Sequence, residues 1–529
     1  MPDWLERNPW LLLCGLALVN FFFMLGGHSL WDVDEPNNAV CAREMLAAGN
    51  WWVPVFNGDL RFDKPILLYW LMMPAYSLLG VNEFTARLPS AMAITVLVGA
   101  VWYFTRRLLD ARSGLVAALL LVSSLHMAVI SRAATPDPLL ILCLGFALLA
   151  LLCVYVENKG GRLLPAAYVA MGVGVLAKGP VAVLMPGLVM LAFLLLMGDW
   201  RAWRRFRPFM GLAIVLAIAL PWYVTVGVLT GGEWLEGFLF HHNIDRFTQP
   251  LQGHRGFPGF YLLTVLLGWF PWSGLLACVL LFGAWRLSRL RQQPMRLFLL
   301  CWLGVFLVFF TVARTQLPNY MLPVFPAVAA LMALWLRDAD EILRRKALVI
   351  AAWAAAIMGF GLLIGGGVAL QLQWPGDWMY GLSMLPLSIA AVVWLIRRQG
   401  SPLLPIALGM ALSVALLAAW TLPGLDEHKI SPRLANSATE AGFGGDELAT
   451  FHYFQPSLLY YHGGRLPMLR DVQVLGDWLV DGKAVVMPSV ALAELPREIL
   501  PYLIIHDRVF GLYARKELLL LSLTPIEET

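Results

Sequence analysis

The residues best suited to chemistry gather in the polar segment that follows the first apolar run. Asp34 and Glu35 stand side by side soon after the apolar run 9–27, and Asp63 directly precedes Lys64. Paired carboxylates can act as a general base or offer hard oxygen ligands to a metal ion. Because a proline follows the two acidic residues, they are also typical of a helix start, and both roles can hold together.

Isolated cations occupy similar short polar segments farther along the chain. They are Lys64, Lys178, Arg246, Arg255 and Arg314. A phosphate carried by a membrane lipid requires cations of this kind near the interface, although each could equally anchor an anionic lipid headgroup. His428 follows two acidic residues and could ligate a metal together with a distant carboxylate, whereas a lone histidine is more often structural.

The elements that position these residues are long and apolar. Of 529 residues, 60% are hydrophobic and 14% are charged, and stretches such as 115–130 and 347–370 hold no Asp, Glu, Lys or Arg. About 20 apolar residues cross the core of a bilayer, where only helices and closed barrels satisfy every backbone group. The alternating pattern of a barrel is absent. The sequence therefore predicts a polytopic α-helical membrane protein.

Apolar runs and their breaks predict about thirteen spans. They lie at 9–27, 85–105, 114–132, 137–156, 164–177, 179–197, 208–228, 259–284, 297–312, 318–336, 347–369, 378–396 and 402–421. The first run is longer than the core of a signal peptide and no clear cleavage site follows it, so we expect it to be retained. Ile66–Leu79 is short for a crossing, and we expect a helix that lies at the interface.

Basic residues cluster after every second predicted span, which predicts an orientation. The clusters are Arg106, Arg107 and Arg112; Lys159 and Arg162; Arg201, Arg204, Arg205 and Arg207; Arg286, Arg289, Arg291 and Arg296; Arg337, Arg344, Arg345 and Lys346; and Arg397 and Arg398. Cytoplasmic loops carry the excess of Lys and Arg, so the N-terminus is predicted to be cytoplasmic and the C-terminus external. The net charge of +4 forms no single patch, and no nucleic-acid partner is indicated.

The chain is predicted to have two domains. Residues 1–425 form a transmembrane domain with a catalytic first external loop at 28–84, and residues 426–529 form a small external α/β domain. Glycine-rich turns and short strand-like runs at 484–487, 502–505 and 518–523 support the second domain. Five of the six cysteines fall in apolar runs, so neither a disulfide framework nor a CxxC metal motif is expected.

Several motifs in the chain follow one known order. They are Trp31-Asp-Val-Asp-Glu-Pro-Asn-Asn-Ala-Val-Cys-Ala-Arg-Glu-Met, Phe62-Asp-Lys-Pro, Thr135-Pro-Asp137, Leu176-Ala-Lys-Gly-Pro180, His242-Asn243 through Arg246-Phe247, and Arg314-Thr-Gln-Leu-Pro-Asn-Tyr-Met-Leu-Pro323. In this order they resemble the bacterial aminoarabinose lipid A transferases. Those belong with the protein O-mannosyltransferase-like class C glycosyltransferases, which are polytopic.

The resemblance implies an enzyme of the bacterial inner membrane that transfers a sugar with inversion. The donor would be a polyprenyl-phosphate sugar such as undecaprenyl phosphate carrying 4-amino-4-deoxy-L-arabinose, and the acceptor would be lipid A or another glycan. By the same resemblance the catalytic carboxylates would be Asp34 with Glu35, and Asp137 near the sugar.

The resemblance also implies the residues that bind the donor and a metal. Lys64 would hold the donor phosphate, and Lys178, Arg246 and Tyr320 would line the donor cavity, where the cation Arg314 is also expected. Asp63 with His428 would match a divalent metal pair, such as one for zinc.

The chain departs from the pattern of the aminoarabinose transferases at three positions. Asn37 and Asn38 stand where those enzymes usually carry Arg and Tyr, and Asp63 replaces a Glu. The Arg that is missing at Asn37 is a cation that could touch the donor. The change to Asp63 shortens a metal ligand by one methylene.

Two alternatives remain open beside transfer to lipid A. Transfer of a mannose-like sugar to Ser or Thr of a protein uses the same kind of donor. A lipid-linked-sugar transporter would place ionisable groups at the bilayer midplane, often in repeated halves. Here they collect at one interface and no repeat is seen, which favours the enzyme. The chain also has no glycine-rich phosphate loop, so no nucleotide cofactor is expected.

Overall fold

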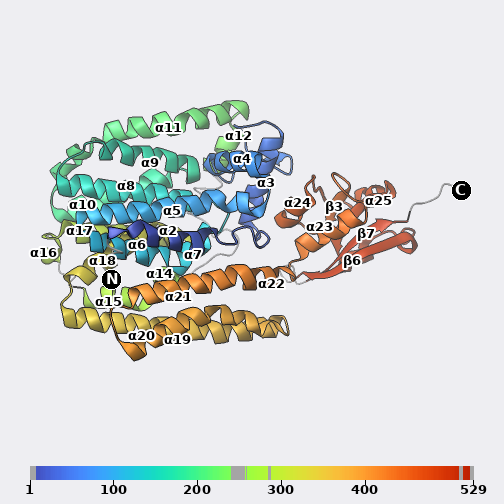
Figure 1. Cartoon of the computed structure of the whole chain (residues 1–529). Coiled ribbons are helices and arrows are strands. Elements are labelled where there is room, and N and C mark those ends of the chain that lie inside the picture. Colours follow the sequence, from blue (N-terminus) through green and yellow to red (C-terminus); the bar gives the residue numbers. More distant parts are fainter. Residues whose placement is uncertain (1–6, 240–256, 258, 284–286, 512–515, 525–529) are drawn as a thin grey trace. The chain divides into compact units, whose positions relative to one another are not determined.

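The computed structural model describes residues 7–239, 257, 259–283, 287–511 and 516–524, and they fall into two compact units (Figure 1). The helical unit comprises residues 1–27, 62–71 and 87–422, and the sheet unit comprises residues 28–61, 72–86 and 423–529. The structure thus divides the chain differently from the predicted boundary at 425. Most of the first loop groups with the C-terminal segment because its backbone and side chains bond to helices after the last span.

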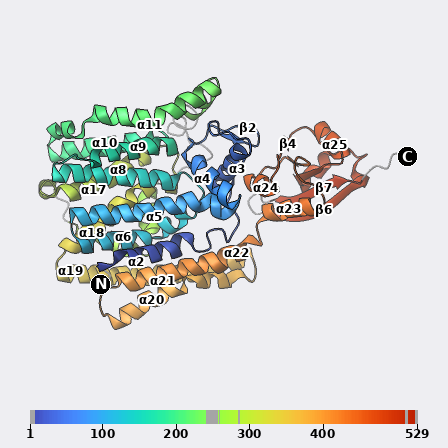
Figure 2. The same ribbon diagram turned by 45° about the horizontal axis from the view of Figure 1, so that its top comes forward.

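The helical unit is built almost entirely from helices, many of which run side by side (Figure 2). Its elements are α2 (Pro9–Ala17), η1 (Leu18–Phe22), α6 (Ala111–Val122), α7 (Leu125–Ser131), α8 (Asp137–Glu157), α9 (Leu163–Lys178), α10 (Val181–Met197), η2 (Trp200–Phe206), α11 (Pro208–Leu229), α12 (Glu233–Glu236), α14 (Phe260–Gly268), α15 (Ser273–Phe282), α16 (Leu287–Leu290), α17 (Pro294–Val312), η5 (Pro318–Val324), α18 (Phe325–Asp338), α19 (Glu341–Gln373), η6 (Asp377–Met384), α20 (Leu385–Arg397), α21 (Leu403–Leu416) and η7 (Leu417–Thr421). Three helices pass from one unit into the other, namely α4 (Leu67–Leu79), α5 (Glu83–Leu108) and α22 (Leu422–Asp426).

The helices have the length and surface of membrane spans, which confirms the polytopic helical class. Eight of the described helices are long and apolar enough to cross a bilayer, and α6 with α7 makes a ninth if the bent pair is one span. Large apolar side chains such as Phe209 and Val228 of α11 face outward. Such a surface suits lipid, because a soluble monomer rarely exposes extended apolar patches. The count of thirteen stays a prediction, since α2 with η1, α9, α10 and α15 are shorter.

Two predicted spans are broken in the structure. The run 114–132 is α6 and α7, bent by 63°, and the run 259–284 is α14 and α15 on either side of Pro271. The breaks bond to each other: Leu125 N donates to Phe270 O at 2.8 Å, and Trp272 Nε1 donates to Ser123 Oγ at 3.0 Å. Interrupted helices are tolerated at membrane depth only where protein groups satisfy the freed backbone in this way.

The sheet unit combines a short hairpin, helices and a mixed sheet of five strands. Its elements are α3 (Asp34–Ala47), β1 (Val55–Phe56), β2 (Asp59–Leu60), α23 (Ile430–Glu440), β3 (Leu448–Phe451), α24 (Pro456–His462), β4 (Met468–Leu469), α25 (Val472–Val480), β5 (Ala484–Pro488), η8 (Ser489–Glu494), η9 (Leu500–Tyr502), β6 (Leu503–Gly511) and β7 (Lys516–Leu523). The strand order is β4-β3-β5-β7-β6, with β3 parallel to β4 and β5, and β7 antiparallel to β5 and β6. The small α/β domain and its three predicted strands are confirmed.

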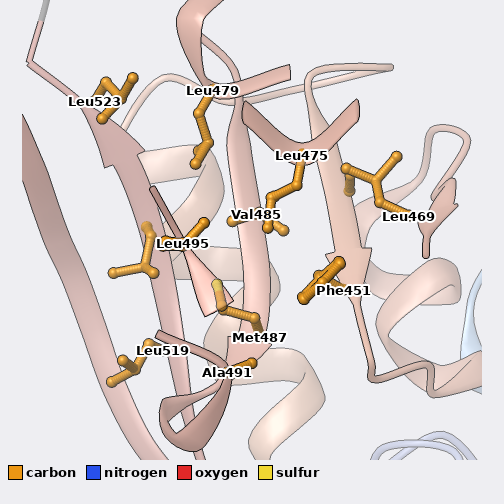
Figure 3. Close-up of a cluster of buried hydrophobic side chains, with 12 residues drawn as sticks. Phe451, Leu469, Leu475, Leu479, Val485, Met487, Ala491, Leu495, Leu519 and Leu523 are labelled. Atoms are coloured by element: carbon orange, nitrogen blue, oxygen red, sulfur yellow. The ribbon is translucent and has the colours of Figure 1, made fainter. Parts of the chain in front are cut away.

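The core of the sheet unit lies between the sheet and α25 (Figure 3). Alternate residues of the strands, such as Val485 and Met487 of β5, point to one face and meet Leu475 and Leu479 of α25. The whole of β5 is buried. A continuous apolar run is typical of a strand that is covered on both faces, which is why 484–487 could be found in the sequence.

Candidate active site

A cavity of 480 Å³ in the helical unit gathers most of the predicted donor-binding residues. Asp63 and Lys64 precede α4, Asp137 is the first residue of α8, Lys178 is the last of α9, and Tyr320 lies in η5; all five line the cavity. Much of the remaining wall is aromatic or aliphatic, including three phenylalanines of α17. An apolar cavity with a few charged groups is the usual form of a site for an amphiphilic ligand.

An ion pair organises the polar part of this donor cavity. Lys178 Nζ lies 2.5 Å from Asp137 Oδ1, and the two side chains are only 18% and 10% exposed. Asn319 Nδ2 donates to Asp137 Oδ2 at 3.2 Å, and Lys178 Nζ lies 5.7 Å from the centre of the Tyr320 ring. The carboxylate therefore holds the lysine in place, and the ring offers it a cation–π contact. Lys64 brings a second cation to the same cavity.

The chain conformation at Gly179 explains how Lys178 reaches the cavity. Gly179 ends α9 with φ of +82°, and a Cβ there would lie 2.7 Å from Phe238 Cζ. Only glycine adopts this conformation without strain and leaves room for the ring. The motif Lys-Gly-Pro thus ends one helix and starts the next at the cavity wall.

The two carboxylates of the first loop have different environments. Asp34 and Glu35 form the first turn of α3, which confirms the predicted helix start. Glu35 is buried and its Oε2 accepts a hydrogen bond from Trp31 N at 2.8 Å. Asp34 is exposed. An exposed carboxylate is accessible to a substrate, whereas Glu35 shapes the turn in which Asp34 stands.

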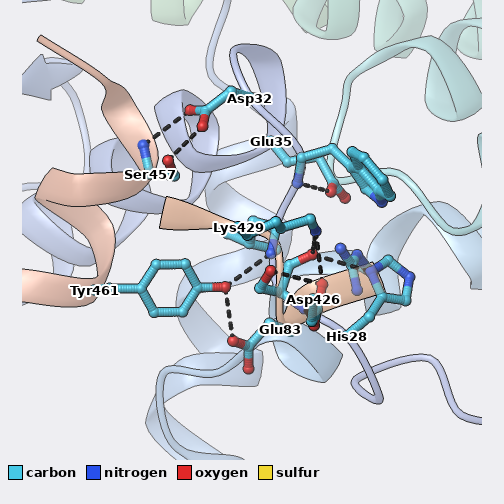
Figure 4. Close-up of polar contacts among 12 residues, drawn as sticks. His28, Asp32, Glu35, Glu83, Asp426, Lys429, Ser457 and Tyr461 are labelled. Atoms are coloured by element: carbon cyan, nitrogen blue, oxygen red, sulfur yellow. Dashed lines mark hydrogen bonds and ion pairs between the residues drawn. The ribbon is translucent and has the colours of Figure 1, made fainter. Parts of the chain in front are cut away.

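The segment before α3 is tied to the C-terminal part of the sheet unit (Figure 4). Ser29 N and Oγ donate to the carboxylate of Asp426 at 2.5 and 3.0 Å. Lys429 Nζ donates to Ser29 O at 2.9 Å and lies 3.9 Å from the centre of the Trp31 ring. The backbone of the loop is thus fixed by two charged side chains that come roughly 400 residues later.

A second set of bonds anchors the same loop on α24 (Figure 4). Ser457 of α24 donates from its backbone N to Asp32 Oδ1 at 2.9 Å and from its hydroxyl to Oδ2. Tyr461 accepts a hydrogen bond from Leu30 N at 2.8 Å and donates to Glu83 at 3.0 Å. Burial raises the pKa of Asp32, and the bonds from Ser457 oppose this change. The residues just ahead of Asp34 are therefore held on both sides.

Known proteins of one kind match this sequence over most of its length. A family model described as dolichyl-phosphate-mannose-protein mannosyltransferase matches residues 63–224. An undecaprenyl phosphate-α-4-amino-4-deoxy-L-arabinose arabinosyl transferase from Pectobacterium atrosepticum is 30% identical over 421 residues, which cover 76% of this chain and 74% of that protein. Its counterpart in Pseudomonas aeruginosa is 32% identical, with 80% and 72% covered. The chain belongs to this family of arabinosyl transferases.

A solved structure agrees with the arabinosyl transferase family in fold. ArnT from Cupriavidus metallidurans, crystallised with undecaprenyl phosphate, matches with a TM-score of 0.81 at 23% identity, over 97% of this chain and 98% of that one. The same protein in the apo state matches with a TM-score of 0.82. The predicted class C glycosyltransferase-like architecture of this arabinosyl transferase is therefore confirmed.

The structure brings together some of the residues predicted for this arabinosyl transferase and not others. Arg314 is exposed and does not line the donor cavity, although both of its neighbours in the sequence do. Arg246 lies outside the described residues, so its predicted role stays a prediction. The helix α17 ends at Val312, and Ala313, which precedes Arg314, has extended backbone.

Asn319 and Phe238 line the cavity but were not assigned a role from the sequence. Asn319 stands directly before Tyr320 in the same motif, so the sequence could have indicated that it lies at the donor cavity. Phe238 had no such signal, because its position depends on the close approach to Gly179.

The two residues of the predicted metal pair belong to different units of the structure. Asp63 belongs to the helical unit and His428 to the sheet unit. Among the described residues, no three His, Cys, Asp or Glu side chains gather closely enough to hold a metal ion. A structural or catalytic metal usually takes three or four protein ligands. The pairing of Asp63 with His428 stays a prediction.

Proposed function

We propose that this protein transfers 4-amino-4-deoxy-L-arabinose from undecaprenyl phosphate to lipid A. Membership of the arabinosyl transferase family supports the sugar and the donor. The observation that carries the proposal is the donor cavity, where Lys64, Lys178 and Asp137 meet apolar walls. A lipid phosphate needs cations for its head and apolar surface for its chain.

An apolar groove offers a path for the chain of the donor. It has a volume of 670 Å³, runs along α10 and α17, and shares Phe309 with the donor cavity. Leucines and valines line most of it. A polyprenyl chain that leaves the cavity at Phe309 would therefore meet a continuous apolar surface.

The cations match the charge that develops during transfer. An oxygen of the acceptor attacks the anomeric carbon while the bond from that carbon to the phosphate oxygen breaks. The sugar is transferred to the acceptor, and the polyprenyl phosphate leaves with one more negative charge than it carried in the donor. Lys64 and Lys178 would stabilise this charge in a cavity with mostly apolar walls, where such stabilisation is stronger than in water. Asp137 holds Lys178 by an ion pair, so the donor phosphate competes with this carboxylate for the lysine.

Asp34 is the proposed catalytic carboxylate. Its exposure in the first turn of α3 leaves it accessible to a substrate. A carboxylate so placed can orient the acceptor oxygen and accept its proton. The buried Glu35 is proposed to act by positioning, through its bond to Trp31 N.

The orientation in the bacterial inner membrane is part of the proposal. Thirteen crossings with the N-terminus in the cytoplasm put the sheet unit on the outer side, with the first loop. The alternation of basic clusters along the chain supports this arrangement.

The test is expression of the chain in a bacterium that lacks its own aminoarabinose transferase but makes the donor lipid. Mass spectrometry of the extracted lipid A should then show one added aminopentose. Lipid A of unchanged mass, with the chain present in the membrane, would contradict the proposal. The sequence departs from the family pattern at Asn37 and Asn38, so the added mass also decides the sugar.

Transfer to protein is the second candidate, and the mannosyltransferase family model that matches 63–224 favours it. The same cells distinguish the two. A hexose on Ser or Thr of envelope proteins, with unmodified lipid A, would support the second candidate.

A further inference from the structure

A second cavity lies at the other end of α18 from the donor cavity. It has a volume of 690 Å³ and is lined by the start of α6, the end of α18, the start of α19, the end of α20 and the segment that leads into α21. Of these helices, α20 packs against both α19 and α21 (Figure 2). Since α18 has 14 residues and follows η5 directly, its ends are roughly 20 Å apart at 1.5 Å per residue. The two cavities are therefore separate sites.

Arginines dominate the polar lining of this second cavity. They are Arg112, Arg337, Arg344, Arg345 and Arg398. The carboxylates in the lining are Asp110 and Glu341, so five positive and two negative charges leave a net charge of +3. We call this site the arginine cavity.

The two carboxylates of the arginine cavity are already engaged. Asp110 caps α6, with Oδ1 accepting from Ser113 N at 2.8 Å, and its Oδ2 lies 3.6 Å from Arg337 Nε. Glu341 pairs with Arg344. These two carboxylates thus pair with two of the five arginines, Arg337 and Arg344. An anion in the cavity would find several donors that converge from different helices.

An orientation signal alone does not explain this arrangement. The positive-inside rule requires basic residues in cytoplasmic loops but no common direction for their side chains. Here the arginines come from three helices and, in Arg398, from the residue that follows a fourth, and they line one cavity. Two of them, Arg344 and Arg345, lie near the N-terminus of α19, where the helix dipole disfavours cations. A bound anion would offset both the mutual repulsion of the converging arginines and the unfavourable interaction of Arg344 and Arg345 with the helix dipole.

The rest of the lining of the arginine cavity is mostly apolar and suits an amphiphile. Leu336, Leu348, Val349, Trp394 and Leu403 contribute to it. Guanidinium groups bind phosphate oxygens in pairs of parallel hydrogen bonds. We propose that the arginine cavity binds a phosphate-bearing anion, namely the headgroup of an anionic phospholipid of the cytoplasmic leaflet, with a soluble phosphate as the other source of the same chemistry.

The test measures lipid binding to the full-length protein in a non-ionic detergent. Native mass spectrometry gives the dissociation constant for phosphatidylglycerol, with phosphatidylcholine as the lipid of zero net charge. The variant is Arg344→Gln with Arg345→Gln. Its matched control is Arg204→Gln with Arg205→Gln, an adjacent exposed pair in η2 that lies outside the cavity.

The unmodified protein and the control should bind phosphatidylglycerol equally, and the Arg344/Arg345 variant should bind it roughly 30-fold more weakly, from about 1 kcal/mol for each arginine. Equal weakening in variant and control, or no weakening in either, would overturn the proposal. If the variant does not fold, Glu341→Gln serves instead. Loss of this competing carboxylate should tighten binding, and unchanged or weaker binding would contradict the proposal.

A second arm identifies the source of the anion. Inorganic phosphate is titrated into the delipidated protein, and the unfolding temperature is followed. Phosphatidylglycerol binding that millimolar phosphate does not displace supports the lipid headgroup. Stabilisation by phosphate that is lost in the variant, without lipid binding, supports the soluble anion. Absence of both effects overturns the proposal.

Discussion

At the scale of residues, charge and burial separate the groups that could react from those that hold the site. Asp137 is almost buried and bound to Lys178 and Asn319, so it serves the cation beside it. Glu35 is buried and bound to backbone. Asp34 is exposed. Asp34 is therefore the carboxylate to test by mutation, and Lys64 is the cation to test beside it.

We expect Asp34→Asn to abolish transfer while the protein still folds. The amide keeps the size of the side chain but cannot accept a proton, and loss of a general base typically lowers kcat by about 10²–10⁴-fold. The measurement is the rate of lipid A modification by purified protein. Asp59→Asn is the control, because Asp59 is also an exposed carboxylate of the sheet unit. Full activity of Asp34→Asn would remove Asp34 from the mechanism.

Lys64→Ala should weaken use of the donor. Removal of a cation from the cavity lowers its affinity for the lipid phosphate, and we expect KM for the donor to rise about tenfold or more, since hydrogen bonds to charged groups contribute about 1.5–3 kcal/mol. Steady-state kinetics at varied donor concentration gives the value. Lys159→Ala removes an exposed cation outside the cavity and should leave KM unchanged. An unaltered donor KM in Lys64→Ala would contradict the phosphate role.

At the scale of elements, the sheet unit is joined by side chains that link distant segments of the chain. The segment before α3 bonds to Asp426, Lys429 and Ser457. On the sheet, Arg433 of α23 forms two hydrogen bonds with Asp507 of β6, at 3.0 and 2.7 Å. Such links stabilise the position of helices on which the first loop rests.

The Arg433–Asp507 link should make the stability of the sheet unit depend on pH. Burial would raise the pKa of Asp507, but hydrogen bonds from Arg433 and Ser437 outweigh it and hold the pKa below its ordinary value of 3.8. The carboxylate therefore adds stability above pH 3.8, and this contribution is lost as the pH falls through the lowered pKa.

Asp507→Asn measures that contribution. We expect a loss of about 1 kcal/mol at neutral pH, because Arg433 is largely exposed and its pairing is screened by solvent. The difference from the unmodified protein should vanish below the pKa of Asp507. Thermal unfolding at several pH values tests this, with Asp477→Asn on the exposed side of α25 as the control. A difference that is independent of pH would contradict the role of the charge.

At the scale of the whole molecule, orientation in the membrane decides which groups meet the substrate. Basic clusters alternate along the entire chain, and the varied polar residues fall in the other loops. If the orientation were reversed, the donor cavity would open to the cytoplasm and the arginine cavity to the outside.

Labelling of cysteines introduced one at a time, in intact cells, tests this orientation. Ser489→Cys in η8 should react with a membrane-impermeant maleimide, whereas Arg201→Cys in η2 should react only after the membrane is opened. Five of the six native cysteines are buried and Cys14 lies within α2, so the unmodified protein is the background control. The reverse pattern would contradict the proposed orientation.

The sequence alone was enough for the membrane class, three of the five strands of the sheet and the motifs of the donor cavity. These features are local: hydropathy, strand-length apolar runs and short motifs such as Lys178-Gly179-Pro180 need no knowledge of distant contacts. Tertiary structure decided the rest. It grouped residues 28–61 with the C-terminal segment, left Arg314 exposed and outside the cavity lining, brought Asn319 to Asp137 and assembled the arginine cavity from separate helices. The physical reason is that these contacts join residues tens to hundreds of positions apart, so their partners are chosen by packing and not by the neighbouring sequence.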